Sequence, residues 1–145
     1  MSDAIPSLSA RQTLRLILMP LLATFACQRL YLHLIGVHHV YPGGYLVHHL
    51  FFGVLIVLPA AFVLAFGPRS QRSAVLSRIA LGIGSAMILD EIVYLVATQA
   101  SDSDYVSALS LKGAMVFIAL GSLLIYSLYR CKSSCTAGSP GGSRA

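Results

Sequence analysis

Charged residues are scarce in this chain. They make up 10% of its 145 residues, whereas 57% are hydrophobic, and ordinary soluble domains carry about 25% charged residues. This scarcity excludes an ordinary soluble domain and indicates an integral membrane protein in one compact unit. The formal charge of +5 does not indicate a nucleic-acid partner, because the basic residues stand mostly at the ends of apolar segments, where they orient helices in a bilayer.

Cysteine and the familiar catalytic motifs are also poorly represented. Of the three cysteines, Cys27 lies within an apolar run and is a small apolar filler. Cys131 and Cys135 fall in a segment expected to face a reducing compartment, where disulfides do not form. The chain has no P-loop, no dinucleotide-binding fingerprint, no Ser-His-Asp order and no internal repeat. Its function therefore has to be sought in other residues.

Four long apolar segments predict an all-α, polytopic membrane protein with four transmembrane helices in an up-down bundle. A spanning helix needs roughly 20 mainly apolar residues, and the segments are 14–36, 45–66, 76–98 and 105–129. Turn residues around Pro42 and Pro68 separate them, and 101–104 should cap the fourth helix. We expect a cytoplasmic N-terminal segment (1–13), a transmembrane domain (14–130) and a disordered cytoplasmic tail (131–145).

The positions of Lys and Arg predict the orientation of the helices. Basic residues flank the first span, fill the connection between the second and third, and follow the fourth, whereas 37–44 and 100–104 have none. Both termini should therefore be cytoplasmic, in a multi-pass protein of the plasma (inner) membrane whose partner is the lipid bilayer. The alternative is a cleavable lipoprotein signal before Cys27. The bulky Phe25 and the apolar run beyond Cys27 disfavour it.

Four ionisable residues share one depth in this topology. Arg29, Asp90, Glu91 and Lys112 lie roughly 10 Å below the surface at which the first span ends. One interpretation is an ion-paired core in which Arg29 and Lys112 neutralise the two carboxylates and fix the helix register. In the other, the carboxylates face a water-filled cavity that binds a proton, a cation or a substrate.

All five histidines fall in one short window above that level, at positions 33, 38, 39, 48 and 49. Imidazole is a good ligand for zinc, copper, iron or nickel. We therefore expect a metal site, with zinc or iron, in which His33, His48, His49, Asp90 and Glu91 are the candidate ligands. Adjacent histidines cannot face one point on a helix, so only one of each pair would bind the metal directly. The roles of His38 and His39 stay open.

Three functions follow from these side chains. In the leading hypothesis a histidine-held metal activates water, with Glu91 as general base and Asp90 beside it, as in a hydrolytic enzyme. In the second, the chain is a small proton- or cation-coupled transporter that forms a homo-oligomer. In the third, it is a structural or accessory membrane subunit whose charges only set helix pairing.

Two short motifs resemble those of a family of small bacterial integral membrane proteins. The motifs are Val47-His48-His49-Leu50-Phe51-Phe52-Gly53 on one segment, and Gly82-Ile83-Gly84 followed by Leu89-Asp90-Glu91 on the next. The resemblance covers about 45–112. It implies a shared His-His and Asp-Glu site in a four-helix architecture, and it carries no reaction with it. His33, His38 and His39 are not part of that pattern.

Overall fold

The computed structural model describes residues 8–36, 43, 48–67, 70–99 and 101–137, and within them the chain is helical. The helices are α1 (Ala10–Ile35), α2 (His49–Phe66), α3 (Gln71–Ala97), α4 (Asp102–Tyr105) and α5 (Ala108–Ala137). Four of them, all except the short α4, are long and apolar enough to cross a membrane. The prediction of an all-α protein with four spans is confirmed.

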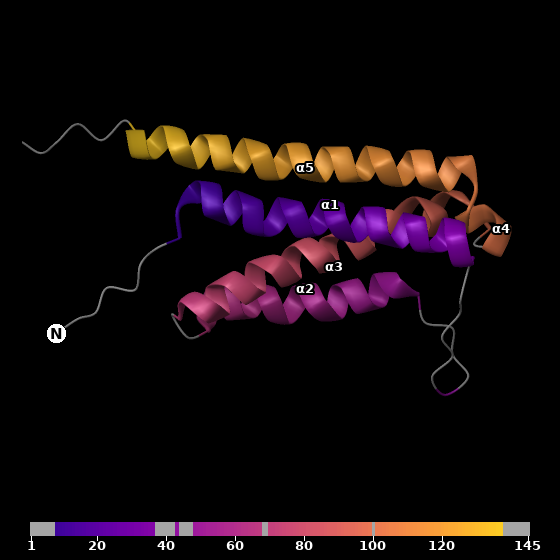
Figure 1. Ribbon diagram of the computed structural model, residues 1–145, viewed down its shortest axis with the longest axis horizontal. Coiled ribbons are helices and arrows are strands. Elements are labelled where there is room, and N and C mark those ends of the chain that lie inside the picture. Colours follow the sequence, from indigo (N-terminus) through magenta and orange to yellow (C-terminus); the bar gives the residue numbers. More distant parts are fainter. Residues whose placement is uncertain (1–7, 37–42, 44–47, 68–69, 100, 138–145) are drawn as a thin grey trace, which may run out of the picture.

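The long helices run alternately in opposite directions, and α3 is the central one (Figure 1). It packs against α2, α1 and α5, and its contact with α2 is the most extensive in the molecule. The start of α1, the end of α2, the start of α3 and the end of α5 lie at one end of the bundle (Figure 1). The short helix α4 lies at the other, here named the α4 end (Figure 1).

The surface of the bundle suits a lipid environment. Large apolar side chains are exposed on every long helix, among them Met19, Leu55, Leu76 and Leu120. The buried apolar core is correspondingly small and centres on Leu21, Ala86 and Ile118. Because lipid tails are as apolar as leucine, these side chains need no protein partner. The model supports a multi-pass membrane protein in a bilayer.

The boundaries of the helices differ from the predicted spans at the connections. The residues expected to cap the fourth span instead build α4, where Ser101 and Asp104 form a reciprocal capping box. The fourth long helix starts only at Ala108 and continues to Ala137, beyond the predicted start of the tail at residue 131. Residues 138–145 and the predicted turn at Pro42 lie outside the described residues.

Candidate functional site

Two ridges of small residues on α3 place its two carboxylates against different helices. Gly82 lies against Ile17 of α1, and Gly84 lies so close to α2 that an added Cβ would come within 2.7 Å of the Gly53 carbonyl oxygen. Asp90 is two turns beyond Gly82, and Glu91 is two turns beyond Gly84, so each carboxylate continues its ridge. Asp90 therefore faces α1, and Glu91 faces the start of α2.

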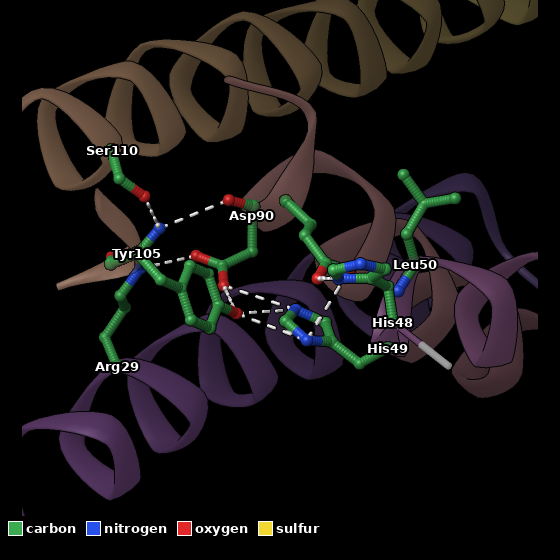
Figure 2. A network of polar contacts seen from close by, with 8 residues as sticks. Arg29, His48, His49, Leu50, Asp90, Tyr105 and Ser110 are labelled. Carbon is green, nitrogen blue, oxygen red and sulfur yellow. Dashed lines mark hydrogen bonds and ion pairs between the residues drawn. The ribbon is translucent and has the colours of Figure 1, made fainter. Parts of the chain in front are cut away.

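Asp90 is paired with Arg29 in the bundle interior. The Nε of Arg29 donates to Asp90 Oδ1 at 2.5 Å, and its Nη2 donates to the Asp90 carbonyl oxygen at 3.2 Å. The same guanidinium also donates to the Tyr105 carbonyl oxygen and to the Ser110 hydroxyl. The Asp90 side chain is completely buried, and the ion pair with Arg29 offsets its charge. The contacts of Arg29 also join α1 to α3, α4 and α5 (Figure 2).

Glu91 serves a different purpose, because its carboxylate accepts hydrogen bonds from the start of α2. Glu91 Oε2 accepts the backbone N–H of Leu50 at 2.6 Å, and Glu91 Oε1 lies 2.8 Å from His48 Nδ1. His48 is the N-cap residue of α2 and supplies no side-chain cap of its own. The carboxylate therefore takes the place of a cap, and the positive end of the helix dipole favours its negative charge.

His49 lies between the two carboxylates. Its Nε2 is 3.4 Å from Asp90 Oδ2, and its Nδ1 is 3.6 Å from Glu91 Oε2. Its ring also contacts the hydroxyl of Tyr105, with the closest approach at Nε2, 2.9 Å away. That hydroxyl donates to Asp90 Oδ2 at 3.0 Å, which leaves its oxygen able to accept from an imidazole N–H. Each ring nitrogen thus faces a different acidic side chain (Figure 2).

Two tyrosines enclose this arrangement. Tyr94 and Tyr105 are almost completely buried, and their ring centroids are 4.6 Å apart. Burial, followed by the negative charge of Asp90, raises the pKa of Tyr105, so its hydroxyl remains a donor at physiological pH. Neither tyrosine is among the residues that the sequence analysis names for the site. Tyr94 belongs to α3, whereas Tyr105 belongs to α4, and it is the Tyr105 hydroxyl that reaches Asp90.

The other residues that we predicted for the site are placed apart from it. Lys112 is exposed, and within the described residues it forms no ion pair with a carboxylate. Its predicted pairing with Asp90 or Glu91 is not seen among these residues, where Asp90 is paired with Arg29. His33 is exposed on α1, one turn beyond Arg29. His38 and His39 lie outside the described residues.

The metal site expected from the histidines has no geometric support in the described part of the chain. No group of three or more His, Cys, Asp or Glu side chains there is arranged to hold a metal ion. The imidazoles and carboxylates are instead directed at one another: His48 at Glu91, and His49 at both acids. Together with Arg29 and Tyr105, these side chains form one connected set of contacts, here named the polar network.

Comparison of the chain with protein-family models, curated proteins and solved structures gave no match. The resemblance drawn from the two short motifs therefore stays a prediction. The site has to be interpreted from its own geometry.

Proposed function

We propose that this chain is a small proton-coupled transporter in which His49, held between Asp90 and Glu91, takes up and releases the proton. The observation that carries the proposal is the position of its ring, with one nitrogen 3.4 Å from Asp90 and the other 3.6 Å from Glu91. A protonated imidazole has two N–H donors, so both would face an acceptor. Ionisable residues in membrane interiors commonly mark proton relays in transporters.

The charge balance of the network favours the same role. Arg29 supplies one permanent positive charge against the two carboxylates of Asp90 and Glu91, which are almost completely buried. With both histidines neutral, these groups carry a net charge of about −1, which is costly in a low-dielectric interior. One proton on His49 removes the imbalance, and its partial exposure, 24% of the side chain, gives that proton a route to solvent.

The proposal also includes the side of the membrane that the site faces. We place the protein in a plasma membrane, where the distribution of Lys and Arg supports an orientation with both termini cytoplasmic. The start of α1 and the end of α5 lie opposite the α4 end (Figure 1), so the network would then face outward. Self-association into a homo-oligomer would cover part of the apolar surface of α2, which packs mainly against α3.

Proton movement in reconstituted vesicles tests the proposal. Purified protein is incorporated into liposomes that contain a pH-sensitive dye, and panels of small carboxylates, amines, sugars and amino acids are added outside. We expect at least one class to change the internal pH in protein-containing vesicles beyond the change in protein-free ones. We expect His49→Phe to abolish that difference, because phenylalanine fills the space but cannot carry a proton.

Lys112→Gln is the matched control, since it removes an exposed charge from outside the network. It should transport as the unmodified protein does. The proposal would be overturned if no class moved protons through correctly folded protein, or if His49→Phe retained full activity. Circular dichroism and gel filtration of each variant in detergent would show whether it is folded.

A further inference from the structure

A cavity lies beside the polar network, and Arg29 forms part of its wall. Its volume is about 360 Å³, and it opens at the α4 end between α1 and the junction of α4 with α5. It is lined by Arg29, Leu30, Leu32, His33, Val106 and Leu111. Small-molecule sites have this character: mostly apolar walls, a few polar groups and a volume of about 300–1,000 Å³.

The polar groups of this cavity are hydrogen-bond donors. A guanidinium has five N–H groups, and four hydrogen bonds of Arg29 are formed within the described residues. One N–H, on Nη1, is left for a further acceptor, and the side chain is 12% exposed. His33, one turn along the same helix, forms no hydrogen bond within the described part of the chain and adds an imidazole edge.

From these features we infer that the cavity binds an amphipathic monocarboxylate. One carboxylate oxygen would accept from Arg29 and the other from His33, while the apolar chain would lie along Leu111 and its apolar neighbours. Two donors suit the two oxygens of a carboxylate, and the leucine and valine walls disfavour a wholly polar solute. The inference rests on the proposed function for one point only, that this bound molecule is the transported substrate.

Arg29 would make such a site part of the transport mechanism. Its guanidinium contacts both the cavity and Asp90. A bound carboxylate would therefore add a negative charge beside Asp90, and the proton proposed for His49 would offset that charge. No other residue of the network lines the cavity. Arg29 therefore offers the direct connection between the bound molecule and the proton site.

Photochemical labelling in lipid nanodiscs tests the binding without a proton gradient. The probe is dodecanoate with a diazirine near its carboxylate, in nanodiscs of a zwitterionic lipid, and the labelled peptides are mapped by mass spectrometry. We expect labelling at residues 29–33 or 106–111. Unlabelled dodecanoate should compete at least about tenfold better than dodecanol, because the alcohol lacks the second oxygen and the charge.

Two leucines of α5 provide a matched pair of variants. Both side chains are exposed, but Leu111 lines the cavity and Leu109 does not. Leu111→Trp should fill the cavity and reduce specific labelling about tenfold, and Leu109→Trp should leave it unchanged. If Leu111→Trp fails to fold, His33→Phe serves instead, because it removes a donor from an exposed position and should abolish the preference for dodecanoate over dodecanol.

Three results would overturn the inference. They are equal competition by dodecanol, equal labelling of both tryptophan variants, and loss of labelling when phosphatidylglycerol replaces the zwitterionic lipid. The last would assign the cavity to a lipid headgroup. If labelling occurs without proton movement in vesicles, the carboxylate site stands and the proposed transport function fails. If another solute class is transported with protons and no labelling occurs, the transport function stands and the carboxylate site fails.

Discussion

The central helix α3 is attached to its neighbours by two different kinds of contact. In its middle, Gly84 meets Gly53 of α2 so closely that no side chain fits between the backbones. At the α4 end, Asp90 and Glu91 hold α1 and the start of α2 through ion pairs and hydrogen bonds. We refer to these as the glycine contact and the polar network.

The difference reflects what a bilayer leaves available for holding helices together. Burying apolar side chains gains little when the alternative is lipid, so association depends on close packing and on polar pairs. The glycine contact supplies dispersion attraction at short range. The polar network, by contrast, supplies directional bonds that specify which side chains meet, and it contains the two carboxylates that are buried inside the bundle.

Removing the Asp90 charge should have the largest effect on stability. Asp90→Asn leaves Arg29 in the interior without its anion, and breaking a buried pair in this way costs about 3 kcal/mol or more of the free energy of unfolding. Titration with sodium dodecyl sulfate in mixed micelles, followed by circular dichroism, would measure it. The double variant Asp90→Asn/Arg29→Gln should recover part of the loss. If Asp90→Asn were as stable as the unmodified protein, the ion pair would not be holding α1 to α3.

The glycine contact should respond almost as strongly to one methyl group. Gly84→Ala forces α2 and α3 apart, because the new Cβ meets the Gly53 backbone, and it should cost about 1–3 kcal/mol. Gly121→Ala is the matched control in α5, where the nearest atom is the end of the Leu89 side chain, which can move aside. Equal unfolding midpoints for the two variants would show that α2 and α3 are less tightly joined than described.

Glu91→Gln should act locally, at the first turn of α2. The change removes the negative charge that faces the helix N-terminus, an interaction of about 1 kcal/mol. Hydrogen–deuterium exchange should then show the amide of Leu50 exchanging about fivefold faster, with little change in the middle of α2. Asp102→Asn, which removes a carboxylate from α4, should leave that exchange unaltered. Unchanged protection in Glu91→Gln would argue against Glu91 as the cap of α2.

The smallest difference should separate two serines of α5. Ser110 is completely buried and accepts a hydrogen bond from Arg29, so Ser110→Ala should cost up to about 1 kcal/mol. Ser122 has a buried hydroxyl without a hydrogen-bond partner in the described structure, so Ser122→Ala should change the unfolding free energy by less than about 0.5 kcal/mol. If Ser122→Ala lowered the free energy of unfolding more than Ser110→Ala does, the hydrogen bond from Arg29 to Ser110 would not be the more stabilising feature.

The four spans were predictable because apolar length is the strongest signal in a membrane sequence. The different directions of the two carboxylates agree with their positions along α3, since Asp90 and Glu91 lie two turns beyond Gly82 and Gly84 respectively. The part taken by Tyr105 was not predictable. It depends on a four-residue helix that hydropathy does not reveal. Hydropathy also does not show which way Lys112 faces, and in the structure its side chain is exposed on α5.

The position of Arg29 in the chain also affects how the protein is inserted into the membrane during synthesis. α1 is the least apolar of the four candidate spans, and the groups that satisfy its arginine are 61 to 81 residues further along the chain. During synthesis, α1 therefore enters the membrane while the Arg29 charge is still without its partners on α3, α4 and α5, which are synthesised later. Chains cut short before Asp90 should consequently insert α1 poorly or lose it to degradation, which glycosylation mapping of nested truncations would reveal.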